Sequence, residues 1–216
     1  MIRPGEEWGS PAESPPDLEI SGDDAALARA VAGTPGALIR FHPSPTSDLA
    51  RAVGLAPGAP AGTALPLDAL ELGDLTLACN MCIFGTPPDR LRRSSPSIEL
   101  EIQLDDRPWF NGRATTVVIA VGQFLRGLDV VPRGHPGDGK AEIQVYELAR
   151  RERRQMRARL ATGTHVPHPR IRQRTARTIG LRAIPDAPSE VDGSTRPERT
   201  GVTTIHVLTG AYRLLI

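Results

Sequence analysis

The stretches that decide the fold are IELEIQL at residues 98–104 and TTVVIAV at residues 115–121. In the first, apolar residues alternate with Glu and Gln, which predicts a half-buried strand because successive side chains point to opposite faces. The second is a continuous run rich in β-branched residues and is typical of a strand buried on both faces. Looser alternation returns at residues 143–145 and 202–207. We therefore expect a mostly-β domain over residues 67–216.

One helix interrupts these strands, at about residues 149–162. Leu148, Met156 and Leu160 share one of its faces, so arginines cover the rest. Such a surface is either simply solvated or in contact with an anionic membrane or phosphate. Nucleic acid is a poorer match, since this segment lacks the aromatic residues that stack on bases. The arginines of residues 150–177, which face a single acid (Glu152), are Arg150, Arg151, Arg153, Arg154, Arg157, Arg159, Arg170, Arg172, Arg174 and Arg177.

A small α/β segment is expected ahead of these strands, over residues 18–66. Residues 1–17 contain four prolines and no periodicity, which predicts a disordered tail. In the α/β segment the elements expected are a helix over residues 25–31 that Gly33 ends, a strand at residues 37–41, a turn at residues 42–47, a helix at residues 48–53 and a loop at residues 55–66.

Composition is that of a soluble globular protein: 216 residues, 39% hydrophobic and 24% charged. Residues 1–110 carry 8 Lys and Arg against 16 Asp and Glu, whereas residues 111–216 carry 18 against 9, which suggests a surface that meets anions. No apolar run is long enough to cross a bilayer, the N-terminus lacks the apolar core of a signal peptide, and two cysteines cannot form a disulfide framework. We expect a cytoplasmic protein that can lie peripherally on the inner membrane face.

Two short motifs are better explained by structure than by chemistry. Cys79 and Cys82 lie three apart in an apolar strand, so their thiols should point to opposite faces, and no second ligand pair is present for zinc. Residues 134–140 have the spacing of a phosphate-binding loop, but Ala141 lacks the hydroxyl needed for Mg²⁺ and a strand follows instead of a helix. We expect a Gly-rich turn that carries Asp138.

The residues Gly22, Asp23 and Asp24 open the first helix and allow two interpretations. Asp23 can cap the helix while Asp24 interacts with its dipole, which requires no ligand. Alternatively, this N-terminus binds a nucleotide phosphate, in which case Mg²⁺ must offset the repulsion from two carboxylates. Spacing alone favours the cap.

Residues 115–193 resemble the C-terminal part of the diacylglycerol kinase and sphingosine kinase catalytic-domain family. The resemblance implies an α+β protein, in which a shortened α/β nucleotide-binding-like segment precedes a two-layer β-sandwich domain with one helix, similar to that of NAD kinases. The segments that carry the resemblance are VVIAVGQFL at residues 117–125, Pro132 with GDGKAE at residues 137–142, TGTHVPHPR at residues 162–170 and VDG at residues 191–193.

The N-terminal half follows the family in register but departs from it in its nucleotide loops. The family has Gly-Asp-Gly-Thr where this chain has Gly22-Asp23-Asp24-Ala25, and Pro-x-Gly-Thr-x-Asn-Asp-x-Ala-Arg where it has HPSPTSDLAR at residues 42–51. Pro45 removes a backbone N–H, and Asp24 adds a negative charge where glycine would let the backbone approach phosphate. The strand–helix–strand that precedes this loop in the family is also missing.

The resemblance implies Mg²⁺- and ATP-dependent phosphorylation of a lipid hydroxyl. It assigns Asp138 as candidate general base, Glu142 as its electrostatic or Mg²⁺-linked partner, and Asp23 as the acid that faces them from the nucleotide side. The alternative is a catalytically inactive relative that binds lipid, an anionic membrane surface or a partner. Positions expected to contact the nucleotide are Gly22, Asp23, Ser44, Thr46 and Asp48; neither a metal-ligand set nor an oligomeric state is predicted.

Overall fold

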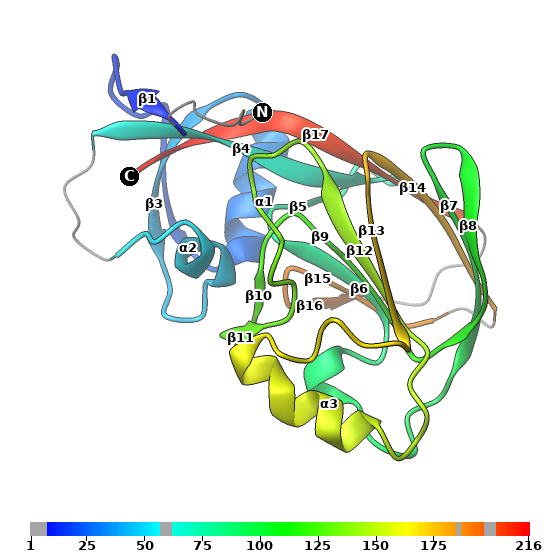
Figure 1. Cartoon of the computed structure of the whole chain (residues 1–216). Coiled ribbons are helices and arrows are strands. Elements are labelled where there is room, and N and C mark those ends of the chain that lie inside the picture. Colours follow the sequence, from blue (N-terminus) through cyan, green and yellow to red (C-terminus); the bar gives the residue numbers. More distant parts are fainter. Residues whose placement is uncertain (1–7, 57–61, 185–186, 197–201) are drawn as a thin grey trace.

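The computed structural model describes residues 8–56, 62–184, 187–196 and 202–216, which form two large sheets packed face to face with helices at one end and below (Figure 1). The nine-stranded sheet contains β1 (Ser10–Pro11), β2 (Leu18–Gly22), β3 (Leu38–Pro43), β4 (Thr63–Leu72), β5 (Leu77–Ala78), β7 (Ile98–Leu104), β8 (Arg107–Ala114), β14 (Thr178–Ile184) and β17 (Val202–Leu215). The six-stranded sheet contains β6 (Met81–Gly85), β9 (Thr116–Ala120), β12 (Ala141–Tyr146), β13 (Ile171–Ala176), β15 (Ser189–Val191) and β16 (Ser194–Arg196).

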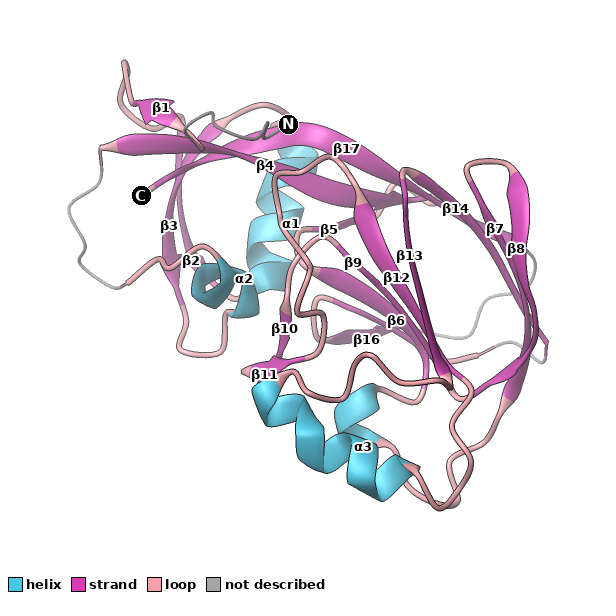
Figure 2. Cartoon of the chain, viewed as in Figure 1, coloured by secondary structure: helices cyan, strands magenta, loops and turns pink. Residues whose placement is uncertain are grey.

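Smaller elements connect and cover these sheets (Figure 2). A two-stranded hairpin, β10 (Phe124–Leu125) with β11 (Leu128–Asp129), projects beside the six-stranded sheet. The helices are α1 (Asp24–Gly33), α2 (Asp48–Ala52) and α3 (Arg153–Arg159), with short 3₁₀ turns at Pro88–Arg90 and Leu160–Thr162.

The sandwich core confirms the strand predictions. β7 alternates between buried and exposed side chains along its whole length, and β9 is buried at every position. Apolar side chains of both strands meet in one core between the two sheets. The expected fold class, an α/β segment followed by a β-sandwich with one helix, is therefore confirmed.

The strand β17 joins the two parts of the molecule. Its first half pairs antiparallel with β14 and β4, and its last residues pair in parallel with β3 after an irregularity between Leu208 and Tyr212. Gly210, within that irregularity, has a φ of 61°, which glycine adopts without strain. One sheet thus continues from the sandwich into the α/β segment.

Three predictions about the N-terminal part need correction. Residues 8–17 are not a disordered tail, because β1 pairs with β4 and the Trp8 indole donates a hydrogen bond to the Pro66 carbonyl (3.3 Å); residues 1–7 lie outside the described residues. The loop predicted at residues 55–66 is wrong from Thr63 onward, because β4 begins there. The boundary placed between residues 66 and 67 therefore falls inside β4.

Candidate functional site

The N-terminal loops use their polar groups to bind one another. Asp23 caps α1 by accepting a hydrogen bond from the Ala26 N–H (2.9 Å), as the cap interpretation predicts. Asp24 is buried and accepts hydrogen bonds from the Ser47 hydroxyl (2.5 Å) and from the backbone N–H groups of Asp48 and Leu49 (3.1 Å each). The Asp24 carboxylate therefore binds the N–H groups at the start of α2, which have no partner within the helix.

Asp48 connects this segment to the sandwich. Its carboxylate accepts hydrogen bonds from the backbone N–H groups of Arg126 and Gly127, in the turn between β10 and β11. The Arg126 guanidinium in turn pairs with Asp89 (3.0 Å) and Glu190. Asp48 thus connects α2 to the β10–β11 turn, although the resemblance predicted that it contacts a nucleotide.

The remaining predicted nucleotide contacts lie in the same loops. The hydroxyls of Ser44 and Thr46 hydrogen bond to each other (2.9 Å) and are exposed. Gly22 has a φ of 143°, and a Cβ there would lie 2.9 Å from the Ala26 side chain, so glycine is required for packing against α1. Pro45 offers no N–H. In the second loop, Ser47, Asp48 and Leu49 already donate to Asp24, so these donors are not free for a phosphate.

Asp192 is a buried carboxylate that the sequence analysis treated only as part of a motif. It accepts hydrogen bonds from the backbone N–H groups of Cys79 (2.7 Å), Asn80 (3.1 Å) and Met81 (2.9 Å). Burial, with the nearby Asp24 carboxylate as the next cause, raises the pKa of Asp192 to about 7. Burial likewise raises the pKa of Asp24 to about 6. Two buried carboxylates whose pKa values are raised thus act on each other electrostatically where the α/β segment meets the sandwich.

A cavity of about 250 Å³ lies beside this pair, between α1 and the β15–β16 hairpin. Asp192 lines it together with two arginines, Arg29 and Arg196, and two hydroxyls, those of Thr76 and Ser194. Ala25 and Ala28 of α1 contribute an apolar wall. A carboxylate with a raised pKa that lines a cavity is a candidate site residue on physical grounds. The signal that could have revealed Asp192 is the Asp-Gly pair after a strand in VDG at residues 191–193.

Asp138 and Glu142, the predicted catalytic acids, form a second cluster. Asp138 accepts a hydrogen bond from the Lys140 N–H (3.0 Å) within its own turn. Burial raises the pKa of Glu142; the Asp138 carboxylate acts in the same direction, and Arg133 opposes it. Asp68 holds this turn by accepting hydrogen bonds from the N–H groups of Gly139 (2.7 Å) and Gly210 (2.9 Å). The structure thus brings Asp138 and Glu142 together, and Asp68 is a neighbour that the sequence analysis missed.

Asp23 is not joined to that cluster by any hydrogen bond or ion pair of the described residues. The Asp138 turn instead contacts the N-terminal segment, where the Trp8 and His135 rings have centroids 4.6 Å apart. Convergence of Asp23 with Asp138 on one cleft stays a prediction.

The groups implied by the resemblance, ATP and Mg²⁺, do not match these loops. Within residues 8–56, 62–184, 187–196 and 202–216, no group of three or more His, Cys, Asp or Glu side chains is arranged to hold a metal ion. The carboxylates of Asp24 and Asp48 already accept hydrogen bonds from the protein at both of their oxygens. The Asp24 and Asp48 acids of these loops are therefore engaged within the protein.

The predicted divergence of the two cysteines is confirmed, but Cys79 lies between β5 and β6 and not in one continuous strand with Cys82. Cys79 packs in the core of the α/β segment, and Cys82 packs in the core between the sheets. Both thiols are buried and free, and burial raises the pKa of each well above its usual range. A buried, protonated thiol is not a reactive nucleophile.

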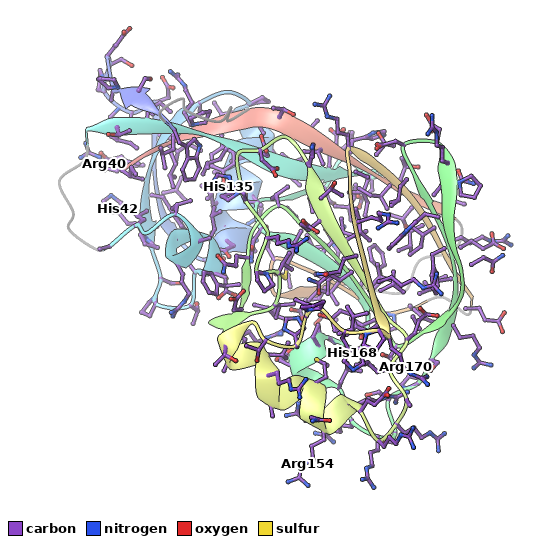
Figure 3. The ribbon with its side chains drawn as sticks, in the orientation of Figure 1. Arg40, His42, His135, Arg154, His168 and Arg170 are labelled. Atoms are coloured by element: carbon purple, nitrogen blue, oxygen red, sulfur yellow. The ribbon has the colours of Figure 1, made fainter. Side chains whose placement is uncertain are left out.

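The predicted basic surface on α3 is present, but Arg153 is not part of it. Arg153 is 4% exposed, and its guanidinium donates hydrogen bonds to the carbonyls of Leu148, Arg92, Arg93 and Ser95, at 2.7–3.4 Å. It therefore holds the loop of residues 92–95 against α3 and is not available to a ligand. Arg154 extends away from the helix into solvent (Figure 3). The exposed arginines of α3, of the turn just before it and of this loop are called here the basic lobe: Arg92, Arg93, Arg150, Arg151, Arg154, Arg157 and Arg159.

No helix in the part of the chain that the structure describes is long and apolar enough to cross a membrane. The buried apolar residues of the described chain form internal cores.

Two packed sheets preceded by a parallel α/β segment define the class of NAD-kinase-like proteins, and comparison with known structures agrees. The chain is similar to a diacylglycerol kinase from Bacillus anthracis str. Sterne (TM-score 0.72, 15% identity, covering 92% of this chain and 77% of that one). It is also similar to yeast NADH kinase complexed with NADH (TM-score 0.54, 14% identity, 92% and 61%). An NAD kinase from Archaeoglobus fulgidus in complex with ATP matches too (TM-score 0.52, 13% identity, 93% and 78%).

The family itself is shown by the sequence. The family model of the YegS C-terminal NAD kinase beta sandwich-like domain matches residues 91–216, more than half of the chain. The chain therefore belongs to this family, and the expected resemblance to lipid kinases of the diacylglycerol kinase type is confirmed. Among curated proteins, none matches the sequence.

Proposed function

We propose that this chain is a kinase-fold protein that binds anionic lipid surfaces and has lost the phosphate-binding capacity of its nucleotide loops. The observation that carries this proposal is the internal use of the loop donors: Asp24 accepts from Ser47, Asp48 and Leu49, and Asp48 accepts from Arg126 and Gly127. Backbone N–H groups that bind a carboxylate of the protein are not free to bind a phosphate.

The basic lobe supplies the lipid-binding surface in this proposal. Its arginines are exposed and come from two segments that Arg153 holds together. Arg93, Ser94, Arg150 and Arg151 line a notch between these segments. Each arginine near an acidic leaflet contributes about 1 kcal/mol, and salt screens the attraction within a Debye length. The protein would then lie peripherally on an anionic membrane face.

Vesicle co-sedimentation tests this proposal. We expect the chain to bind vesicles that contain phosphatidylglycerol more tightly than vesicles of phosphatidylcholine alone, and to be released by salt. Replacing Arg150, Arg151 and Arg154 with Glu should weaken binding by at least about a hundredfold, from the loss of about 1 kcal/mol per arginine.

The matched control reverses three exposed arginines elsewhere, Arg107, Arg113 and Arg177, which gives the same change in net charge. Equal losses in the two triple variants, or binding that is indifferent to salt, would show that the basic lobe is not the membrane surface.

A second candidate, phosphorylation of a lipid hydroxyl, is favoured by the two acid clusters. A carboxylate whose pKa is raised toward neutrality, as at Asp192, can accept a hydroxyl proton at physiological pH. Burial also raises the pKa of Glu142, which lies near Asp138. Formation of a phosphorylated lipid from ATP, abolished by Asp138→Asn in a protein that stays folded, would establish this function in place of the first.

A further inference from the structure

We infer that the notch lined by Arg93, Ser94, Arg150 and Arg151 binds the terminal phosphomonoester of a lipid headgroup, in preference to a phosphodiester headgroup at the same membrane charge. This inference rests on the proposed function and deepens it, because it names the headgroup that the basic lobe recognises. A surface that responded only to membrane charge would not distinguish these two classes of lipid.

The notch brings cations from two segments of the chain to one place. Arg93 and Ser94 come from the loop of residues 92–95, whereas Arg150 and Arg151 come from the turn before α3. The notch has a volume of about 490 Å³, within the range of small-ligand sites, and all four residues are exposed. A headgroup that enters the notch can therefore contact guanidinium groups from both segments at once.

Both segments are held in place by contacts inside the protein. The buried Arg153 guanidinium donates hydrogen bonds to three carbonyls of the loop of residues 92–95, at 2.7–3.2 Å. Across the notch, the Glu152 carboxylate accepts a hydrogen bond from the Ala149 N–H (2.8 Å) and closes the turn before α3. Because the two backbone segments are already ordered, a ligand has to order only the side chains of the notch.

The positive charge of the notch is not balanced by the protein. Glu152 is the acid next to Arg151 in the sequence, but it pairs with Arg170 (3.5 Å). In the part of the chain that the structure describes, no carboxylate forms an ion pair with Arg93, Arg150 or Arg151. The notch is therefore suited to an anion that carries more than one negative charge.

A phosphomonoester matches these donors better than a phosphodiester does. It carries about 1.5–2 negative charges at pH 7 and presents three terminal oxygens, whereas a phosphodiester carries a single charge and presents two. A guanidinium group binds such oxygens through two parallel hydrogen bonds. Three arginines and the Ser94 hydroxyl can all find acceptors on a monoester, whereas a diester leaves some of them without one.

Binding to vesicles of equal surface potential tests this inference. One set contains phosphatidic acid and the other phosphatidylglycerol, each in phosphatidylcholine, with contents adjusted until the zeta potentials are equal. We expect the chain to bind the phosphatidic acid vesicles at least about tenfold more tightly, because of the additional charge-assisted hydrogen bonds. Equal binding to the two sets would overturn the inference and leave the proposed function standing, whereas binding to neither set would overturn both.

Two double variants with the same change in net charge locate the preference within the basic lobe. The first, Arg93→Gln with Arg151→Gln, removes one arginine from each side of the notch. The second, Arg154→Gln with Arg159→Gln, removes two exposed arginines that do not line it. The first variant should bind the two vesicle sets equally, and the second should keep the preference while binding both sets more weakly. Loss of the preference in both variants, or in neither, would show that the notch is not the headgroup site.

Soluble glycerol 3-phosphate distinguishes a lipid from a free phosphate ester as the ligand. It carries the same phosphomonoester, but a single soluble molecule cannot engage the rest of the basic lobe as a membrane does. We expect it to displace the protein from phosphatidic acid vesicles only at millimolar concentrations. Displacement at micromolar concentrations would overturn the assignment to a lipid headgroup and point to a soluble phosphate ester.

Discussion

Arg153 shows how a single residue can be read wrongly from its neighbours in the sequence. It stands among arginines that are exposed, yet its side chain is buried and satisfies four backbone carbonyls. Helical spacing places Arg153 on the same face of α3 as the buried Met156 and Leu160. The sequence does not show which backbone carbonyls lie within reach of its guanidinium. The charge of a residue could be predicted from sequence, and its partners could not.

Removal of this side chain should therefore destabilise the fold. Arg153→Ala leaves buried carbonyls without donors, and we expect a loss of about 2–3 kcal/mol in the free energy of unfolding, because hydrogen bonds to charged groups contribute strongly. Urea denaturation measures this loss. The neighbouring Arg154→Ala, which removes an exposed arginine, should change stability by less than about 0.5 kcal/mol. Similar values for both variants would contradict the assigned role.

At the scale of elements, the β10–β11 hairpin depends on a residue from another part of the chain. Asp48, at the start of α2, accepts hydrogen bonds from the backbone N–H groups of Arg126 and Gly127 at the hairpin turn. Asp48→Ala should raise the hydrogen-exchange rates of these two amides by at least about tenfold, since their closed state loses its acceptor. Amides of β12, which pairs on both sides with other strands, serve as the internal control. Unchanged exchange at Arg126 and Gly127 would show that the turn is held by other contacts.

Elements with a strong local pattern were predictable, and those that depend on distant partners were not. The alternation at residues 98–104 and the apolar run at residues 115–121 encode burial directly, and both became strands as expected. β4 was missed at its start, because Pro66 and the preceding Pro- and Gly-rich sequence signal a loop, although Pro66 tolerates its place in the strand. β1 has two residues and exists only by pairing with β4.

At the scale of the whole molecule, one sheet and several buried carboxylates join the two parts into a single body. β17 carries the sandwich sheet into the α/β segment, and Asp24, Asp48, Asp68 and Asp192 each bind backbone donors of another segment. The sequence allowed the family to be predicted, and the roles assigned to Asp138 and Glu142 stay predictions. It did not reveal that the acids of the nucleotide loops bind the protein itself, because that depends on which loops meet in three dimensions.

The most direct test of this account is calorimetric titration of the full chain with Mg²⁺-ATP. Because Ser47, Asp48 and Leu49 donate to Asp24 and Pro45 has no N–H, we expect no saturable binding, with a dissociation constant weaker than about 1 mM. A micromolar dissociation constant would contradict the account and restore nucleotide use to this fold.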